Sequence, residues 1–307
     1  MTLTELKYIV AVAREKHFGR AAEACFVSQP TLSVAIKKLE EELDVKLFER
    51  GSNEVSVTPL GGDIVRQAQS VIEQAAAIKE IAKRGKDPVS GPLRLGIIYT
   101  IGPYLLPDLV RQAIERVPQM PLILQENFTA KLLDMLRTGE LDCAVMAEPF
   151  PDTGLAVAPL YDEPFLAAVP KGHPMAKRKS VTAEELKNET MLLLGTGHCF
   201  RDHVLEVCPE YARFASGAEG IRKSFEGSSL ETIKYMVASG MGVTVVPALS
   251  VPAEAQTHIR YIKFSPPAPT RRVVLVWRRT FTRYEAIAAL RNCIYACALP
   301  RVKRLSE

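Results

Sequence analysis

Residues 28–43 read SQPTLSVAIKKLEEEL, and this run determines the structure of the N-terminal part of the chain. One isoleucine and three leucines, from Leu32 to Leu43, follow one another at spacings of 4, 3 and 4 residues, which predicts a helix with one buried face. The helix is expected to begin at Ser28, because a serine hydroxyl can accept a hydrogen bond from an amide of the first turn. Pro30 fits there, since that turn has amides to spare.

Elements predicted on either side of this run complete a winged helix-turn-helix. Apolar periodicity predicts a helix from Leu3 to Ala13 and a short one at residues 21–24. After the run, residues 48–58 read FERGSNEVSVT, which are two strand-like pieces around a Gly-Ser-Asn turn. Three helices at the start of a chain are common without DNA binding, so it is the added hairpin that favours a DNA-binding domain.

The front of the predicted recognition helix carries short hydroxyl and amide side chains that can enter the major groove. Gln29 can read adenine, while serine and threonine can meet phosphates or base edges. The acidic residues 40–42 would be repelled by phosphate, so only the front should approach the duplex. The predicted DNA contacts are Ser28, Gln29, Pro30, Thr31, Ser33, Lys37 and, from the hairpin, Arg50.

Five short runs within this domain carry a family resemblance. They are Phe18-Gly19-Arg20-Ala21-Ala22, Val27-Ser28-Gln29-Pro30-Thr31-Leu32-Ser33, Ile36-Lys37-Lys38-Leu39-Glu40, Leu47-Phe48-Glu49-Arg50 and Thr58-Pro59-Leu60-Gly61. In this order they resemble the signature of the LysR-type transcriptional regulators. The resemblance implies a DNA-binding domain over residues 1–58 and transcription activation through contact with RNA polymerase.

A long helix is predicted after this domain. It should run from Pro59 to about Arg84, inside a linker and hinge over residues 59–90. Its apolar residues form a heptad seam. On an exposed helix, such a seam needs a partner helix to cover it. The seam consists of Ile64, Ala68, Val71, Ala75, Ile78 and Ala82. We therefore expect a dimerisation helix, a homodimer and a roughly two-fold symmetric operator.

From residue 91 onward, strand-like and helix-like segments alternate, which predicts an α/β fold with parallel sheets. Ligand sites in such folds open at the carboxyl ends of strands, and three of these ends are predicted near Thr100, Thr129 and Cys199. The resemblance implies two Rossmann-like, periplasmic-binding-protein-like subdomains that flank a cleft. They are predicted at about 91–163 plus 268–307 and at about 164–267, within a regulatory region of residues 91–307.

The stretch Gly195-Thr196-Gly197-His198-Cys199 places a thiol where a helix is expected to begin, after a glycine turn. Helix amides and the neighbours His198 and Arg201 favour a thiolate there. Cys208 lies nine residues on, so one intact helix would separate the two Cα atoms by roughly 13 Å, against roughly 5.5 Å for a disulfide. Bonding would require local unfolding, which Pro209 makes easier. Two cysteines that only fill apolar space are the alternative.

A closer resemblance within the family concerns this same region. The run Gly197-His198-Cys199-Phe200-Arg201-Asp202, with Cys208 nine residues later and Ser229-Leu230-Glu231-Thr232 beyond, is similar to the hydrogen peroxide sensors among the LysR-type regulators. The resemblance makes Cys199 the peroxidatic and Cys208 the resolving thiol. It places Thr100, Thr129, His198 and Asp202 in the peroxide pocket. It further implies an oxidative-stress activator, a homotetramer built from dimers, and reduction by glutaredoxin or thioredoxin.

Composition limits the other classes of function. The chain has 307 residues, 47% hydrophobic residues and a net charge of +4, and acidic and basic residues balance before residue 91, so bulk charge does not indicate DNA. The six cysteines include no CxxC pair, so no metal and no cofactor is predicted. No apolar run is long enough to span a membrane and no signal peptide is evident, which predicts a cytoplasmic protein.

Two rival functions stay open beside a peroxide-responsive regulator that is not an enzyme. One is a LysR-type regulator that binds a small organic anion in the cleft, with incidental cysteines. The other is a thiol peroxidase with steady turnover, against which the DNA-binding signature stands. A ligand-induced melting shift without thiol oxidation would favour the first rival. Peroxide consumption at many equivalents per chain would indicate the second.

Overall fold

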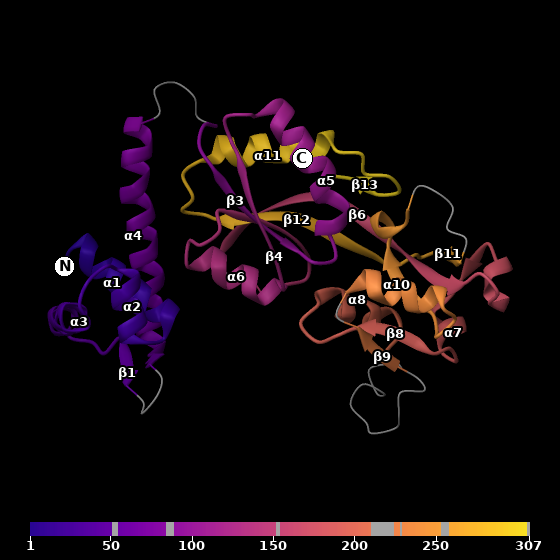
Figure 1. Ribbon diagram of the computed structural model, residues 1–307, viewed down its shortest axis with the longest axis horizontal. Coiled ribbons are helices and arrows are strands. Elements are labelled where there is room, and N and C mark those ends of the chain that lie inside the picture. The colour runs from indigo at the N-terminus through magenta and orange to yellow at the C-terminus, as the bar shows by residue number, and fades with distance from the viewer. Residues whose placement is uncertain are drawn as a thin grey trace.

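The computed structural model describes residues 1–50, 55–83, 89–151, 154–209, 224–227, 229–252 and 258–305. Figure 1 shows a small helical domain and the long helix α4 at one end, and a larger α/β region beyond. Two expectations fall outside the described residues. They are the tip of the predicted hairpin at 51–54 and the path of the chain after Pro209, at 210–223.

The N-terminal elements form the predicted winged helix-turn-helix. Helices α1 (Leu3–Glu15), α2 (Phe18–Ala24) and α3 (Gln29–Leu43) pack together, and β1 (Phe48–Arg50) pairs antiparallel with β2 (Val55–Val57). Ser28 is the N-cap of α3 and its hydroxyl accepts a hydrogen bond from the Thr31 amide at 3.3 Å. The apolar face predicted for α3 is fully buried from Leu32 to Leu39.

Helix α4 (Pro59–Lys83) forms as predicted, but its apolar seam is divided between two environments. Ile64 and Ala68 pack into the core of the N-terminal domain, beside α1. Val71 and Ile78 are exposed, by 38% and 69%. The expectation of one continuous seam for a partner is therefore wrong for its first half, because α1 of the same chain covers it. Val71 and Ile78 remain available to another protomer, while the side chain of Ala82 lies outside the described residues.

The C-terminal region is built on one nine-stranded sheet in the order β4-β3-β5-β12-β6-β11-β7, with β10 and β13 also paired to β6. The strands are β3 (Leu93–Ile98), β4 (Leu122–Asn127), β5 (Cys143–Ala147), β6 (Leu155–Pro170), β7 (Ser180–Val181), β10 (Thr244–Pro247), β11 (Ile259–Phe264), β12 (Thr270–Arg278) and β13 (Lys303–Arg304). Among the described strands of this sheet, β3 pairs in parallel with β4 and β5, β7 pairs in parallel with β11, and the other pairs are antiparallel. The all-parallel expectation is thus wrong, because β6 and β12 pair antiparallel with each other and with their other neighbours.

Two apolar cores lie along this sheet, as expected for two subdomains. The first is covered by α5 (Gly102–Arg116), α6 (Thr129–Arg137) and α11 (Tyr284–Ala296). The second gathers α7 (Ala183–Leu186), α8 (Cys199–Val207), α10 (Leu230–Ala238) and the short parallel pair β8 (Met191–Leu194) and β9 (Ser224–Gly227). Short 3-10 turns lie at Pro174–Lys177 and Ala248–Ser250.

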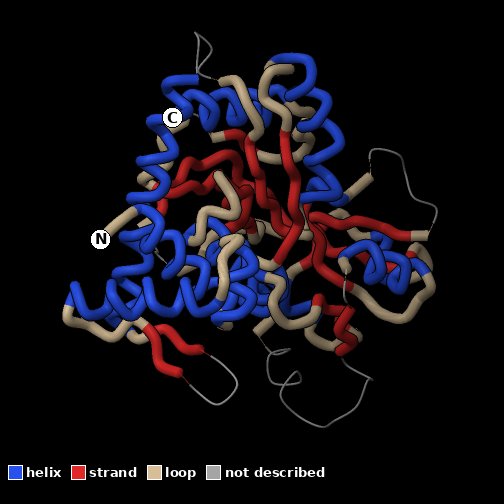
Figure 2. Tube along the Cα trace, turned by 60° about the vertical axis from the view of Figure 1, so that its left-hand side comes forward, coloured by secondary structure: helices blue, strands red, loops and turns tan. Residues whose placement is uncertain are grey.

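The 16-residue strand β6 continues from the first core into the second, and β12 runs beside its first half. Figure 2 shows the strands of the large sheet inside, with helices around them. Among the described residues, no helix combines the length and the apolar character that crossing a membrane requires.

Candidate functional site

Cys199 is the first residue of α8, as the glycine turn predicts. β8 ends at Leu194, and the turn passes through Gly197, whose φ of 97° lies in a region that side chains other than glycine rarely adopt. A Cβ at Gly197 would also lie 3.2 Å from Cδ1 of Phe128. The turn therefore depends on glycine for its conformation and for its close approach to Phe128.

A small cavity of about 10 Å³ lies beside Cys199. Its lining includes Thr100 after β3, Thr129 at the start of α6, and His198 with Cys199 from the cysteine turn; the other lining residues are Ile98, Tyr99, Asn127, Phe128 and Gly197. The predicted convergence of three strand ends is therefore present. The volume suits one molecule about the size of water.

Asp202 is the one residue of the predicted pocket that does not line this cavity. It lies in the first turn of α8, and its side chain is exposed. His198 does line the cavity, and its ring is packed edge-on against Phe128 at 4.8 Å and Tyr99 at 5.8 Å between centroids. The structure thus brings Thr100, Thr129, His198 and Cys199 together, and leaves Asp202 out of the cavity lining.

The electrostatics of Cys199 differ from the expectation of a thiolate favoured by a helix N-terminus. Burial raises the pKa of the Cys199 thiol above its usual value. The Thr129 hydroxyl and the positive charge of Arg271 lower that pKa, and the charge of Asp202 raises it. The effect of burial on the pKa is the largest of these, because the sulfur lies mostly inside the protein. The cation that lowers the pKa is Arg271, whereas the sequence predicted Arg201.

The Thr129 hydroxyl is committed to the cysteine site. Its oxygen is buried and has no other hydrogen-bond partner at standard geometry within the described residues. In the reduced protein this hydroxyl interacts with the Cys199 sulfur and lowers the pKa of the thiol. A donor with no competing partner is available to whatever occupies the cavity.

Arg271 is a site residue that the sequence did not reveal. It lies in β12, is 2% exposed, and donates from Nη1 to the Thr100 hydroxyl at 2.8 Å and from Nη2 to the Thr100 carbonyl at 3.0 Å. Its charge is balanced by Glu163, which is fully buried, at 2.8 Å. In the sequence, Arg271 is a charged residue at the start of an apolar strand. Such a residue usually lies at a solvent-exposed strand end, so it did not indicate a buried site.

Cys208 lies at the opposite end of α8 from Cys199. It is the C-cap residue, fully buried in the core of the second subdomain, and its amide donates to the Val204 carbonyl at 2.9 Å. All six cysteines are in the thiol form. Because α8 is one continuous helix between the two thiols, the separation of roughly 13 Å between their Cα atoms follows from helix geometry.

The predicted DNA-contacting side chains lie at the front of α3. Ser28, Gln29, Pro30 and Thr31 are exposed, and Ser33 is half-buried. Lys37 is exposed and forms an ion pair with Glu41 at 3.7 Å. Arg50 ends β1, and its side chain is outside the described part of the structure. This front therefore presents hydroxyl and amide groups to solvent, as an element that enters the major groove requires.

No group of three or more histidine, cysteine or carboxylate side chains suited to a metal ion is found within the described ranges. The chemistry that these residues offer is instead that of a thiol beside hydroxyl groups, an imidazole and a buried guanidinium.

Comparison with known proteins gives matches over both parts of the chain. Residues 3–62 match the bacterial regulatory helix-turn-helix protein family, lysR family, and residues 86–297 match the LysR substrate binding domain. A hydrogen peroxide-inducible genes activator of Pectobacterium carotovorum is 41% identical over 292 residues, which cover 94% of this chain and 95% of that protein.

Two solved structures are similar over large parts of the chain. A full-length OxyR variant from Pseudomonas aeruginosa is 49% identical, with a TM-score of 0.81, and covers 100% of this chain and 98% of its own. A reduced form of OxyR from N. meningitidis is 40% identical, with a TM-score of 0.67, and covers 71% of this chain and 100% of its own.

Proposed function

The chain belongs to the LysR family of transcriptional regulators, and from this premise we propose that it is a peroxide-responsive activator switched by a reversible Cys199–Cys208 disulfide. The relatives named as hydrogen peroxide-inducible activators and as OxyR support peroxide as the signal. The observation that carries the proposal is the small cavity where Cys199 meets Thr100, Thr129 and His198.

The first step forms a bond between sulfur and oxygen. Cys199 loses its proton, the thiolate attacks one oxygen of hydrogen peroxide, the O–O bond breaks, and hydroxide leaves and is protonated to water. The product is a sulfenic acid on Cys199. Thr129 and His198 line the cavity, and in this proposal they donate to the departing oxygen, while the charge of Arg271 favours the thiolate. Asp202, which does not line the cavity, remains a proposed pocket residue.

The second step joins the two sulfurs. The Cys208 thiol loses its proton and attacks the Cys199 sulfur, the S–O bond breaks, and water leaves as the disulfide forms. Cys208 cannot reach Cys199 while α8 is helical, because the Cα atoms are roughly 13 Å apart. Oxidation therefore requires α8 to unwind and Cys208 to leave its core, and the disulfide then stabilises the new arrangement.

The switch is proposed to act on DNA through α3 and through assembly. The residues Ser28, Gln29, Pro30, Thr31, Ser33, Lys37 and Arg50 are the proposed contacts with a two-fold related operator. The exposed half of α4 is proposed to pair two protomers, and dimers are proposed to form a homotetramer. The unit boundaries at residues 58 and 90, with subdomains about 91–163 plus 268–307 and about 164–267, form part of this proposal.

The remaining partners and the location follow from the proposed peroxide-responsive regulator. We infer that the oxidised form contacts RNA polymerase, that glutaredoxin or thioredoxin reduces the disulfide, and that the protein works in the cytoplasm without a cofactor. One oxidation sets one switch, so it is not proposed to be an enzyme. An organic effector bound beside Cys199 is disfavoured, because a cavity of about 10 Å³ is far smaller than the few hundred Å³ typical of such ligands.

The test compares the variants Cys199→Ser and Cys208→Ser with the natural protein, in peroxide-dependent transcription and in DNA binding. We expect both variants to lose the transcriptional response and to keep DNA binding, and only Cys208→Ser to accumulate a sulfenic acid. Cys25→Ser is the control, because Cys25 is the other cysteine residue that is not fully buried and lies outside the site. A Cys199→Ser variant that still responds at low peroxide would refute the mechanism, and consumption of many equivalents per chain would indicate a peroxidase.

A further inference from the structure

His203 lies in the middle of α8, between the two cysteines, and ties this helix to the other subdomain. Its side chain is 5% exposed, and Nε2 lies 2.7 Å from the backbone oxygen of Glu148. Because a carbonyl only accepts, Nε2 carries the proton and donates. Nδ1 is then an acceptor, and this buried atom has no hydrogen-bond partner within the described residues.

The carbonyl that accepts this hydrogen bond is itself held in place. Glu148 directly follows β5, and its amide donates to the Arg272 carbonyl on β12 at 3.0 Å. Residue 148 is therefore held at the end of β5, beside β12, in the sheet of the first subdomain. The hydrogen bond from His203 is a tether between a rigid sheet and the helix that separates Cys199 from Cys208.

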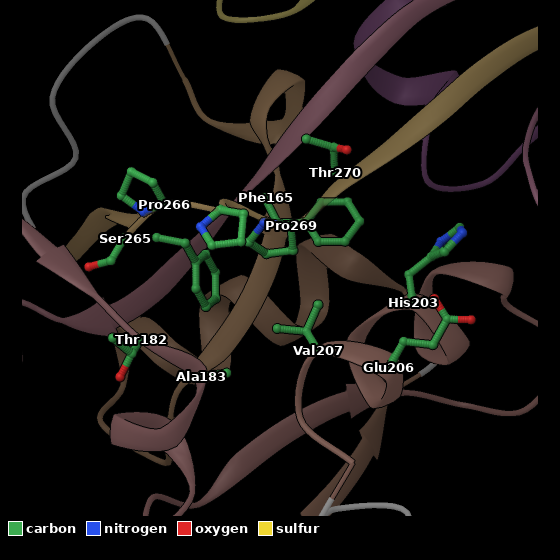
Figure 3. A pocket seen from close by; sticks show the side chains of 12 residues that line it. Phe165, Thr182, Ala183, His203, Glu206, Val207, Ser265, Pro266, Pro269 and Thr270 are labelled. Carbon is green, nitrogen blue, oxygen red and sulfur yellow. The ribbon is translucent and has the colours of Figure 1, made fainter.

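The tether matters because α8 has open space along one flank. Figure 3 shows His203 and Glu206 at one end of a cavity, with Phe165 and Pro269 among its other walls. The cavity has a volume of about 490 Å³ and is also lined by Val207, from the last turn of α8. Beyond its tether, the His203 ring is packed by Phe165 and Phe200, at 6.1 and 6.4 Å between centroids.

We propose that His203 is a positioning residue for the second oxidation step, and that its hydrogen bond to Glu148 sets the rate at which Cys208 reaches the oxidised Cys199. The inference rests on the proposed Cys199–Cys208 disulfide. Unwinding α8 moves residue 203 and breaks the tether, whereas the attack of Cys199 on peroxide occurs with the helix in place. The tether therefore restrains disulfide formation without affecting the first step.

The test separates the two steps by rapid quenching and mass spectrometry of the full chain after addition of peroxide. In His203→Leu, which removes the donor, disulfide formation should be roughly fivefold faster, the effect of one net hydrogen bond, with sulfenic acid formation unchanged. In His203→Gln, the amide can donate from nearly the same position, so both rates should match the natural protein. Glu206→Gln is the control, because Glu206 is exposed on the same helix near His203.

A pH series gives a second readout of whether the buried His203 side chain restrains α8. The neutral ring fits the site, while an imidazolium would place a second N–H, on Nδ1, where the described residues offer no acceptor. Burial lowers the pKa of His203 below its usual value, and the charge of Arg271 lowers it further, against the hydrogen bond to Glu148 and the charges of Glu206 and Asp202, which raise it. Protonation should therefore loosen α8. As pH falls below the usual range of histidine, the rate of disulfide formation in the natural protein should rise relative to His203→Gln at the same pH.

The outcomes are distinct. Equal rates of disulfide formation in His203→Leu and the natural protein, or a His203→Gln variant as fast as His203→Leu, would overturn the tether. If His203→Leu does not fold, His203→Asn serves instead, because its amide is too short to reach Glu148 and should also accelerate the second step. A natural protein that forms no Cys199–Cys208 disulfide would contradict the proposed function itself, which is a separate failure.

Discussion

Arg271 and Glu163 form a buried ion pair at 2.8 Å, and both side chains are almost fully excluded from solvent. The pair joins the two subdomains. Arg271 donates to the hydroxyl of Thr100, which lines the cysteine cavity, and its guanidinium lies 5.1 Å from the Phe200 ring of α8. Glu163 accepts from the Leu249 amide at 2.7 Å. The cation that favours the Cys199 thiolate is therefore fixed by contacts on both sides of the site.

Replacing Arg271 by methionine should destabilise the protein strongly. The substitution leaves the Glu163 carboxylate buried without a counter-ion, for which a cost of about 3–5 kcal/mol is expected. Denaturant unfolding measures this cost. Arg272→Met is the matched control, because the adjacent Arg272 pairs with Asp162 on the exposed side and its loss should leave the midpoint nearly unchanged. Equal midpoints for the two variants would show that the buried pair does not stabilise the fold.

Thr129→Val should slow the reaction of Cys199 with peroxide by a few-fold. The valine keeps the shape of the side chain but removes the hydroxyl that lowers the pKa of Cys199. The pKa should rise, and the thiolate population at neutral pH should fall, as ultraviolet thiolate absorbance can measure. Thr138→Val is a control at the other end of α6, since Thr138 is the C-cap of that helix and does not line the cavity. An unchanged pKa in Thr129→Val contradicts the role of the hydroxyl.

The rate of sulfenic acid formation should rise with pH through the neutral range. Burial raises the pKa of Cys199, so the thiol predominates at neutral pH and the reactive thiolate is a minor species. Below that pKa, each added pH unit should increase the thiolate population, and hence the rate, by about tenfold. Stopped-flow kinetics with the Cys208→Ser variant isolates this step. A rate that is flat from slightly acidic to alkaline pH would mean that the thiolate already predominates.

Gly197→Ala should impair the site by changing the turn before Cys199. The φ of 97° is strained for any residue with a Cβ, which costs about 1–3 kcal/mol, and the new methyl group would press on Phe128. We expect a lower melting temperature and a slower first oxidation step. Gly172→Ala is the control, because a Cβ there meets no atom within 4 Å. Identical behaviour of the two variants would show that the turn tolerates a side chain.

Local patterns in the sequence predicted the elements that carry the proposed function. The N-cap at Ser28, the strand Met191–Leu194 and the start of a helix at Cys199 all follow from turn chemistry and apolar periodicity. The strand-end rule was enough to bring Thr100 and Thr129 to one cavity with the cysteine. Each of these features depends on neighbours in the sequence or on a general property of α/β sheets.

Features that depend on distant neighbours were not predicted. The part of β6 that pairs with β12, residues 155–164, contains Pro159, Asp162 and Glu163, and these residues obscure a strand that forms because β12 pairs with it. The seam of α4 is half covered by α1, and sequence periodicity cannot tell an intramolecular from an intermolecular partner. The raised pKa of Cys199 arises from burial by residues of the other subdomain, which the helix N-terminus argument did not include.

The most direct test of the account is the intact mass of the full chain after one equivalent of hydrogen peroxide, followed by mapping of the cross-linked peptides. The account predicts the loss of two hydrogens and a single new link between Cys199 and Cys208, which a thiol reductant reverses. A stable oxidised Cys199 without any link, or a link that leaves Cys199 out, would contradict it.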